Sequence, residues 1–491
     1  MGHTSVSEDL QWIRGKTVLV AGSRVSGLAT IAPLRELGAD VLVTDSAADA
    51  VARAVELGAR GILQADLLAE PSIFGDVSLV VTSPGLRPDA PVLAAASARA
   101  IPVWGDVELS WRIDRAEIYG PATQWLVVTG TNGKTTTTSM LASILSSANL
   151  VGVACGNIGL PVLDALQSTP HPSVLAVELS SFQLFWAPSV RPAAGTVLNI
   201  AEDHLDWHGG MDGYVEAKAR ALRGDVAVVG LDDPRAAALG AAAPAGRVFG
   251  FRLGEPAVGE LGVSDGYLID NAFGAAVALL PLAEVVPAGP AGTMDALAAA
   301  GLARSIGVSV DAVAEGLRTY ELGAHRASVV RVENGVTFVD DSKATNPHAA
   351  RSSLLAYDRV VWIAGGLLKG ASVDELVAEV APRLAAAFVI GRDGSEIAEA
   401  LARHAPDVPV VTFAAGDDAG VTDVAQDAEA VMRAVVRSAA ERAQPGDTVL
   451  LAPAAASLDM FIDYGHRGRS FAAAVDSLDA AGIGRVGGQP S

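Results

Sequence analysis

The segment with the most distinctive chemistry is a glycine-containing turn, Gly130-Thr131-Asn132-Gly133-Lys134-Thr135. It follows an apolar run that begins at Trp125 and precedes a helix-compatible run from Thr136 to Leu145. A strand, such a turn and a helix in this order bring backbone N–H groups and a helix N-terminus together, which is how many proteins bind phosphate groups. We therefore predict a nucleoside triphosphate site in which Lys134 contacts the β- and γ-phosphates and the Thr135 hydroxyl binds Mg²⁺.

The match to the generic phosphate-loop pattern is incomplete, because that pattern has a glycine where this chain has Val128. The alternative interpretation is a glycine turn followed by a surface lysine. The apolar strand before the turn and the helix after it favour a phosphate site. The residues that we expect to bind the nucleotide here are Gly130, Thr131, Asn132, Gly133, Lys134, Thr135 and Thr136.

Two further side chains that suit phosphate chemistry lie at the ends of predicted strands. Glu178 ends an apolar run that starts at Val174, and His204 lies in a loop after another such run. In α/β proteins the carboxyl ends of parallel strands gather ligands. Mg²⁺ prefers oxygen, so Glu178 is a suitable ligand, whereas a lone histidine such as His204 is more often structural.

An alternating α/β organisation must position these residues. From Thr17 onward, short β-branched runs alternate with Ala- and Leu-rich amphipathic stretches, which is typical of βαβ units around a parallel sheet. We predict three domains: Rossmann-like over 1–118, a central P-loop ATPase-type domain over 119–324, and Rossmann-like again over 325–491. The predicted strands cover residues 17–22, 41–45, 79–85, 101–109, 125–130, 174–181, 195–204, 336–342, 360–366, 387–391, 408–413 and 447–454. The pattern from 254 to 290 predicts no definite structure.

Length and composition agree with a multi-domain enzyme. The chain has 491 residues, and domains usually contain roughly 100–200 residues. Its formal net charge of −21 disfavours nucleic acid as a partner, because nucleic-acid affinity depends on neutralised phosphates. The single cysteine, Cys155, fits a reducing compartment, and the start of the chain shows no signal-peptide pattern. No apolar run approaches the roughly 18 residues of a membrane span. We expect a cytoplasmic protein without membrane insertion.

The first block has a glycine turn of a different kind. After its first strand it reads Gly22-Ser23-Arg24-Val25-Ser26-Gly27, with Arg24 where the dinucleotide fingerprint has its middle glycine. A side chain at that position obstructs close approach of a pyrophosphate, so an NAD site is disfavoured. Asp45 ends the next strand, where such folds often place a carboxylate for a ribose or base edge. The alternative is a purely structural domain with capping Asp and Ser residues.

The string TGTNGKTT at residues 129–136 resembles the phosphate loop of the Mur ligase and folylpolyglutamate synthase superfamily. Further matching strings follow in the same order: GNIG at 156–159, ELSSFQL at 178–184, NIAEDHLDWH at 199–208, YVEAKAR at 214–220, AHR at 324–326, DDSKATNP at 340–347 and LAPAAASLDMF at 451–461. Within the Mur ligase family, DSKATN and the SLD-containing ending are most similar to the branch that adds D-glutamate.

The resemblance implies an ATP-dependent carboxylate–amine ligase. By family likeness, the substrates would be UDP-N-acetylmuramoyl-L-alanine and D-glutamate, joined through an acyl phosphate in peptidoglycan precursor synthesis. ATP and two Mg²⁺ ions would take part, and we expect a monomer. The folate ligases of the same superfamily are disfavoured, because they lack a UDP-binding first domain. A nucleotide-sugar-binding homologue without turnover and a simple phosphoryl-transfer kinase remain as alternatives.

The resemblance also assigns roles to individual residues. UDP and the muramoyl group would contact Val25, Ser26, Asp45, Ser46, Ser83, Pro84, Gly85 and Asn157. D-Glutamate would contact Thr345, Lys369, Ser457, Leu458 and Tyr464, with Lys343 nearby. His325, Arg326 and Asp341 would touch the nucleotide. The catalytic set would be Lys134, Glu178, His204 and Lys218, and the metal ligands Thr135, Glu178, His204 and Lys218.

Lys218 has a special place in this set, because family members carry it as a carbamate. A lysine beside Mg²⁺ and a triphosphate is repelled as an ammonium by the metal, which favours reaction of the amine with CO₂. The carbamate is an anion that suits a metal ion. The alternative is a helical surface lysine flanked by Glu216 and Arg220.

One segment departs from the family pattern. The family has His-Asn and a further Asn before an NALAA-like helix, whereas this chain reads Pro290-Ala291-Gly292-Thr293-Met294-Asp295-Ala296-Leu297. The nucleotide contacts expected from those asparagines are therefore in question, with Asp295 as a partial substitute.

Overall fold

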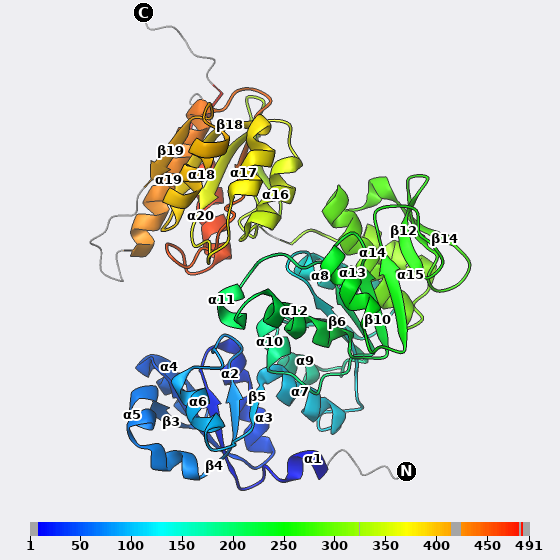
Figure 1. The fold of residues 1–491 in the computed structure, drawn as a ribbon, viewed down its shortest axis with the longest axis vertical. Coiled ribbons are helices and arrows are strands. Elements are labelled where there is room, and N and C mark those ends of the chain that lie inside the picture. Colours follow the sequence, from blue (N-terminus) through cyan, green and yellow to red (C-terminus); the bar gives the residue numbers. More distant parts are fainter. Residues whose placement is uncertain (1–7, 324, 414–423, 481–482, 485–491) are drawn as a thin grey trace, which may run out of the picture. The chain divides into compact units, whose positions relative to one another are not determined.

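The computed structural model describes residues 8–323, 325–413, 424–480 and 483–484 (Figure 1). Residue contacts divide the chain into two compact units. The first comprises Met1–Ile200 and Trp207–Tyr320, and the second comprises Ala201–Asp206 and Glu321–Ser491. Residue 324, where we predicted the end of the central domain, lies outside the described residues. We describe each unit by itself.

The first unit begins with a five-stranded parallel sheet in the order β3-β2-β1-β4-β5. Its strands are β1 (Thr17–Ala21), β2 (Asp40–Asp45), β3 (Arg60–Leu63), β4 (Val77–Thr82) and β5 (Val103–Gly105). The helices between them are α2 (Val25–Ala29), α3 (Ile31–Glu36), α4 (Ala48–Glu56), α5 (Gln64–Ala69) and α6 (Pro91–Ser97). The central strand β1 is apolar and almost wholly buried, as expected for a parallel strand covered on both faces.

The last strand predicted for this block is partly wrong. Residues 101–109 were expected to be extended, but only Val103–Gly105 forms a strand, and α7 (Asp106–Arg115) begins immediately after it. Asp106 and Glu108 occupy the first turn of α7 and Arg112 and Arg115 its last turn. Acidic residues at a helix N-terminus and basic residues at its C-terminus both interact favourably with the helix dipole. This charge pattern was the available signal for a helix.

A nine-stranded sheet forms the rest of the first unit, in the order β14-β13-β12-β11-β10-β9-β6-β8-β7. Its strands are β6 (Gln124–Thr129), β7 (Gly152–Gly156), β8 (Val174–Glu178), β9 (Ala194–Val197), β10 (Val226–Gly230), β11 (Arg247–Phe251), β12 (Glu260–Ser264), β13 (Tyr267–Asp270) and β14 (Val277–Pro281). Pairing is parallel from β7 to β12, and β12, β13 and β14 pair antiparallel. The segment that the sequence pattern left undefined is this antiparallel extension.

Strand β6 lies at the point where the strand order reverses. The chain goes from β6 to β7 and β8 on one side and then to β9 on the other side. Such a reversal opens a crevice at the carboxyl ends of the strands, which is where open α/β sheets bind ligands. The phosphate loop follows β6 directly.

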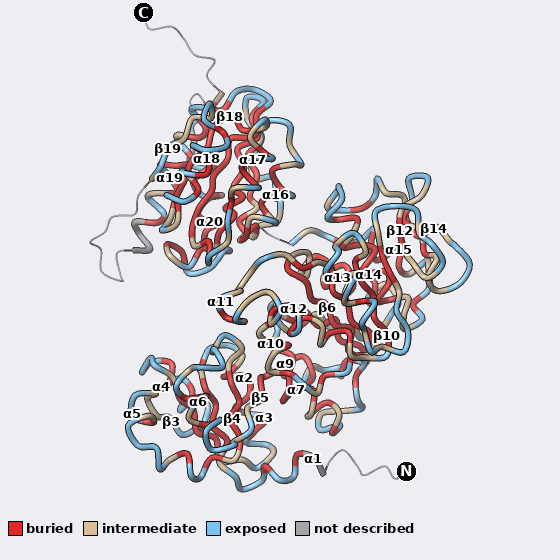
Figure 2. The backbone as a smooth tube through the Cα atoms, viewed as in Figure 1, coloured by how far each residue is buried: buried red, intermediate tan, exposed pale blue. Residues whose placement is uncertain are grey.

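Helices cover both faces of this sheet. The helix after the phosphate loop, α8 (Lys134–Ser147), packs against α14 (Pro290–Ser305) and α15 (Val310–Arg318). Shorter helices in the same unit are α9 (Val162–Leu166), α10 (Ser181–Phe185), α12 (Met211–Ala219) and α13 (Pro234–Ala241). Figure 2 shows that the buried backbone follows the strands of each sheet, whereas exposed residues lie mainly in loops and on outer helix faces.

Helix α7 joins the two sheets of the first unit. Its Trp111 ring meets the Trp125 ring of β6 edge to face, with centroids 5.2 Å apart. The Trp125 indole Nε1 donates to the Asp114 carboxylate over 3.0 Å. An aromatic pair in this geometry contributes roughly 0.5–1.5 kcal/mol beyond its buried area. Buried packing therefore links the first sheet to the strand that carries the phosphate loop.

The second unit contains a six-stranded sheet in the order β15-β16-β20-β17-β18-β19. Its strands are β15 (Ser328–Glu333), β16 (Val336–Asp340), β17 (Val360–Gly365), β18 (Leu384–Ile390), β19 (Val410–Phe413) and β20 (Thr448–Leu451). Only β15 runs antiparallel to its neighbour. Its helices are α16 (Pro347–Leu355), α17 (Asp374–Val380), α18 (Gly394–His404), α19 (Val424–Arg442) and α20 (Tyr464–Asp476), and an apolar core lies on each face of the sheet.

The sequence missed β15 because that strand lies at the sheet edge and is nowhere fully buried. Edge strands lack the continuous apolar run of a central parallel strand. Across the part of the chain that the structure describes, no helix is both long and apolar enough to cross a bilayer.

Candidate active site

The phosphate loop connects β6 to α8 in a well-defined conformation. Gly133 has φ +84°, a left-handed value that favours glycine, and immediately precedes the first residue of α8. The backbone N–H of Asn132 donates to Asn199 Oδ1 over 2.9 Å. Lys134 Nζ donates to the carbonyls of Gly130 (3.0 Å) and Thr131 (2.8 Å). The lysine thus lies over its own loop, in reach of any phosphate group that the loop binds.

Asp295 of α14 contacts this loop at Gly133. A Cβ atom added to Gly133 would lie 2.2 Å from Asp295 Oδ1, so only glycine fits against this carboxylate. Thr137 Oγ1, one turn into α8, donates to the same oxygen over 3.1 Å. Asp295, the partial substitute for a family asparagine, is therefore in direct contact with the phosphate loop. Through this contact, α14 can affect how the loop binds its ligand.

Glu178 lies at the carboxyl end of β8, next to the strand that carries the phosphate loop. Its side chain is buried. Oε1 accepts a hydrogen bond of 2.8 Å from Asn157 Nδ2, while buried Oε2 has no hydrogen-bond partner among the described residues. An unpartnered buried carboxylate oxygen is costly, and a cation would satisfy it. The carboxylate therefore fits Mg²⁺, and Thr135 is the second residue of α8, the helix that follows the neighbouring strand and its loop.

Lys218 is buried in α12, so the alternative of a surface lysine is wrong. Its Nζ donates to Gly130 O of the phosphate loop over 2.7 Å. It lies 4.6 Å from the centroid of the Tyr214 ring, and the Tyr214 hydroxyl is hydrogen-bonded to Thr131 Oγ1 at 2.9 Å. Two residues of α12 thus contact the loop directly.

His204 belongs to the second unit, within the short segment Ala201–Asp206. Its φ is +54°, and its Nε2 lies 3.5 Å from Asp203 Oδ2. Thr135, Glu178 and Lys218 belong to the first unit. Among the residues that the structure describes, no three His, Cys, Asp or Glu side chains are grouped so as to hold a metal ion. The four predicted metal ligands are thus divided between the two units.

Around the glycine turn of the first sheet, Asp45 has a structural partner that we did not predict. Its Oδ2 accepts hydrogen bonds from Ser23 N (2.8 Å) and Ser23 Oγ (2.9 Å), and its Oδ1 accepts one from Ala47 N (3.1 Å). Partial burial raises the pKa of the carboxyl group, but these hydrogen bonds outweigh it and leave the pKa below its ordinary value. The charged carboxylate therefore fixes the turn that precedes α2.

The other predicted UDP contacts surround the same turn. Val25 and Ser26 form the first turn of α2, and Val25 is exposed. Ser83 Oγ donates to Gly22 O over 3.1 Å. The loop after β4 is also tied to the central part of the unit, because Trp207 Nε1 donates to Gly85 O over 3.2 Å. The structure thus brings the ends of β1, β2 and β4 together, as parallel pairing requires.

Asp106 is a buried carboxyl group that the sequence did not single out. The Ser26 and Gln183 side chains lie against it, and Oδ1 has no hydrogen-bond partner among the described residues. Burial raises the pKa of Asp106 from 3.8 to about 6, and hydrogen bonds oppose this only in part. The group lies between the predicted diphosphate loop and the helix that follows Glu178.

We expect Asp106→Asn to stabilise the protein at neutral pH. The folded pKa is raised, so the folded state holds the proton more tightly, and stability is lost as pH rises from 3.8 through 6. From this pKa shift, the advantage of the variant should increase by about 2 kcal/mol between pH 4.5 and 7.5. Thermal denaturation of both proteins at the two pH values measures this. An advantage that is larger at pH 4.5 would contradict the assignment.

The predicted D-glutamate residues follow strands of the second unit. Lys369 lies after β17, with φ +55°, and its Nζ forms an ion pair of 2.9 Å with Asp203 Oδ1. Ser457 is buried after β20, while Leu458 and Tyr464 are exposed. Lys343 Nζ lies 4.9 Å from the Tyr464 ring centroid. These residues lie beyond the carboxyl ends of β17, β20 and β16, the same edge of one sheet.

Arg467 of α20 holds the loops at this edge together, and the sequence analysis did not identify it. It is buried and donates to Ser342 O (2.8 Å), Ser342 Oγ (3.0 Å), Ala455 O (3.0 Å) and Gly365 O (3.3 Å). Burial lowers the pKa of Arg467 to about 9. A planar guanidinium with five donors suits this task. Nothing in the local sequence indicated which loops it would join.

The residues expected at the nucleotide in this unit lie near β16. His325 Nδ1 contacts Asp340 Oδ2 at 2.6 Å, and Asp341 Oδ1 accepts from Ala327 N over 3.2 Å. Asp341 also accepts from the Ser353 hydroxyl. Burial raises the pKa of Asp341, and its hydrogen bonds offset part of that rise. Asp341 and Arg326 thus share one loop region of the second unit.

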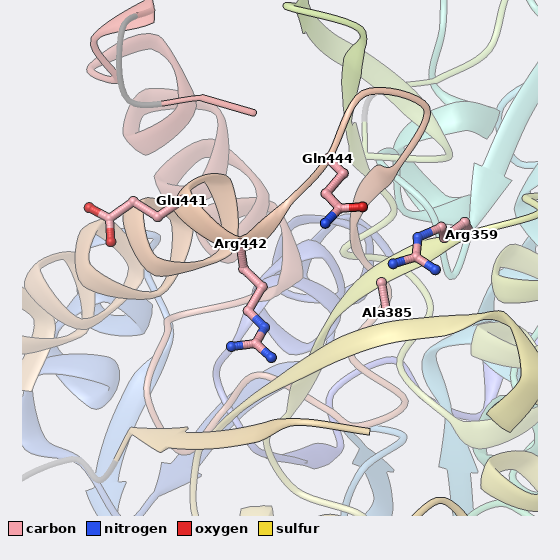
Figure 3. A pocket seen from close by; sticks show the side chains of 5 residues that line it. All are labelled: Arg359, Ala385, Glu441, Arg442 and Gln444. Atoms are coloured by element: carbon pink, nitrogen blue, oxygen red, sulfur yellow. The ribbon is translucent and has the colours of Figure 1, made fainter. Parts of the chain in front are cut away.

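A separate pocket of about 310 Å³ lies elsewhere on the second unit (Figure 3). Its lining residues are Arg359, Ala385, Glu441, Arg442 and Gln444. Arg359 precedes β17, Ala385 is near the start of β18 and Gln444 precedes β20. These are the amino ends of the strands, opposite to the edge that carries Lys369 and Ser457, so this pocket is not part of the candidate site.

Comparison with known proteins adds direct evidence. A family model described as the Mur ligase middle domain matches residues 128–261, and one described as the glutamate ligase domain of Mur ligases matches residues 325–455. The UDP-N-acetylmuramoylalanine–D-glutamate ligase of Rhodococcus jostii (strain RHA1) is 63% identical, covering 97% of this chain and 98% of that protein. The protein of the same name from Mycolicibacterium smegmatis is 56% identical, covering 94% and 96%.

Solved structures show the same architecture at low sequence identity. The UDP-N-acetylmuramate–alanine ligase of Thermotoga maritima has a TM-score of 0.58 and 19% identity, covering 94% of this chain and 99% of that chain. A bifunctional folylpolyglutamate synthase/dihydrofolate synthase, solved with Mn, AMPPNP and L-glutamate, has a TM-score of 0.52 and 20% identity, covering 75% and 93%. At this identity the likeness concerns the fold, and it confirms the predicted α/β class.

Proposed function

Because the chain belongs to the Mur ligase family, we propose that it joins D-glutamate to UDP-N-acetylmuramoyl-L-alanine as ATP is converted to ADP and phosphate, in peptidoglycan precursor synthesis. The observation that carries this proposal is the 63% identity to a ligase of that name over nearly the whole length of both chains. The geometry supports the same chemistry, since the phosphate loop, Glu178 and Lys218 meet at the carboxyl ends of β6 and β8.

In the proposed reaction, the carboxylate of the muramoyl-L-alanine substrate attacks the γ-phosphorus of ATP. The bond from the γ-phosphorus to the bridging oxygen of ADP breaks, and an acyl phosphate forms. The amine of D-glutamate then attacks the acyl carbon, and inorganic phosphate leaves as the amide forms. The phosphate loop holds the triphosphate through backbone N–H groups, and Lys134 neutralises charge that develops on the transferred group.

Glu178 and Thr135 are the oxygen donors of the first unit that would hold Mg²⁺. When bound, the metal would neutralise the repulsion between the substrate carboxylate and the γ-phosphate. Asn157 donates to Glu178 Oε1, so the unpartnered Oε2 would be the oxygen that binds the cation. His204 is the remaining proposed ligand. As a carbamate, Lys218 would place an anion beside the loop, with its remaining N–H still able to donate to Gly130 O.

We also propose three domains, with boundaries near residues 118 and 324, a monomeric state and a cytoplasmic location. The three separate sheets support the three domains. Small-angle scattering and light scattering would test the domain arrangement and the oligomeric state.

The proposed activity predicts a strict dependence on three substrates. Phosphate release should require ATP, UDP-N-acetylmuramoyl-L-alanine and D-glutamate together. D-Glutamate should exceed L-glutamate and D-aspartate in kcat/KM by at least about tenfold, because donors from Lys369, Thr345 and Ser457 fix the hand and length of the amino acid. Coupled phosphate assays with single omissions measure both effects. Equal rates with L-glutamate would refute the assignment, and a stable phosphorylated acceptor would indicate a kinase.

A further inference from the structure

A buried carboxylate from α14 lies against the phosphate loop. Asp295 is 7% exposed and belongs to the second turn of α14. Its Oδ1 fills the space where a side chain on Gly133 would begin, because a Cβ atom there would lie only 2.2 Å away. The same oxygen accepts a hydrogen bond of 3.1 Å from Thr137 Oγ1. The carboxylate, the loop and α8 all belong to the first unit, so these contacts lie within one compact body.

This carboxylate supplies a charge that α8 itself lacks. The N-terminus of a helix carries a partial positive charge, and acidic side chains are common in the first turn for that reason. Helix α8 begins with Lys134 and three threonines and has no acidic residue in its first turn. Asp295 places a carboxylate at this helix end from the neighbouring helix instead. While the loop is empty, the interaction with the helix dipole stabilises the N-terminus of α8.

A bound nucleotide would change this balance. Its phosphates are attracted by the N–H groups of the loop and by the same helix dipole that favours the carboxylate. Two anions near one helix end repel each other, and the repulsion is strong where protein excludes water. The hydrogen bond from Thr137 and the packing against Gly133 hold the carboxylate at the loop. Part of the attraction for phosphate is therefore offset by a charge that stays in place.

We propose that Asp295 weakens the binding of nucleotides to the phosphate loop through its negative charge, and so favours the release of ADP. Because ADP is a product of the proposed function, the inference rests on that function. The repulsion increases with the negative charge of the phosphate chain, so it is larger for ADP than for AMP and is absent for adenosine. Removal of the charge should strengthen nucleotide binding, whereas loss of a purely supporting contact would weaken it.

The test is Asp295→Asn, which keeps the size of the side chain and an oxygen acceptor for Thr137 but removes the charge. Displacement of a fluorescent ADP analogue by adenosine, AMP and ADP measures the three affinities in parent and variant. The Kd of ADP should fall at least about threefold in the variant, that of AMP should fall less, and that of adenosine should stay unchanged. The dissociation rate of ADP should decrease, and the gain in affinity should shrink at high salt.

Thermal denaturation gives an independent readout. Without nucleotide, Asp295→Asn should unfold at a lower Tm than the parent, because the N-terminus of α8 loses its anion. Saturating ADP with Mg²⁺ should raise the Tm of the variant by more than it raises that of the parent. Asp311→Asn is the matched control, since it removes an exposed carboxylate from the first turn of α15 and should change neither the ADP affinity nor the Tm shift.

An ADP affinity of Asp295→Asn that equals or falls below that of the parent would overturn the proposal, as would equal gains for adenosine and ADP. If Asp295→Asn does not fold, Asp295→Ser removes the same charge with a smaller side chain and should also bind ADP more tightly. A parent that binds no ADP would overturn the proposal as well. A parent that binds ADP but makes no amide would refute the proposed function alone, because the displacement titrations do not depend on turnover.

Discussion

Replacing Lys134 with alanine is expected to lower kcat by about 10²–10³, with a much smaller change in KM for D-glutamate. The ammonium group lies over the phosphate loop, where it donates to Gly130 O and Thr131 O. Negative charge moves onto the transferred group and ADP as the bond breaks, so a cation at this place binds the transition state better than the ground state. Steady-state kinetics at saturating substrate measure the loss.

Two controls separate this role from general effects of removing a lysine. Lys134→Arg retains the charge and should recover part of the activity. Lys16→Ala removes an exposed lysine just before β1 and should behave as the parent. A kcat for Lys134→Ala within threefold of the parent would eliminate the proposed role of the lysine.

The second large effect is expected at Lys218. The alanine variant should lose at least about 10²-fold in activity, because Lys218 of α12 contacts the phosphate loop. It should still bind the UDP-linked substrate, because the predicted UDP residues surround β1, β2 and β4. Buried beside a loop that binds a triphosphate and a metal, a carbamate would supply an anion that the chain otherwise lacks at this place. A small carboxylate such as acetate should restore part of the activity by filling the vacated space.

The modification itself can be observed without an activity assay. Intact protein labelled with ¹³C-bicarbonate should show a carbamate resonance that is missing in Lys218→Arg, a variant that keeps a cation but cannot be carbamylated. Fluorescence or calorimetric titration of the UDP-linked substrate into Lys218→Ala checks that the variant is folded. Absence of the resonance from the active parent, together with an active alanine variant, would exclude the carbamate.

Much of the first-unit chemistry could be predicted from local sequence. The phosphate loop is contiguous, and the strand before it and helix after it lie in the same stretch of chain, so spacing alone indicated the site. Parallel strands with continuous apolar runs, such as those beginning at Thr17 and Val360, were predicted for the same reason. We did not predict the edge strand β15 or the antiparallel strands β12, β13 and β14, because partly exposed strands carry a weaker pattern. Strands β3, β7, β10 and β11 were also not predicted, although β10 is buried along its whole length.

What only the tertiary structure decided is which distant residues meet. Lys218 contacts Gly130 across 88 positions, Asp203 pairs with Lys369 across 166, and Arg467 reaches Ser342 across 125. Such contacts arise from the strand order and from which helices cover each face of a sheet, neither of which is encoded in the spacing of neighbouring residues. The sequence by itself determined the residue types and the strand ends at which ligands gather. Folding decided which buried charges have partners, because burial and pairing depend on packing between elements far apart in the chain.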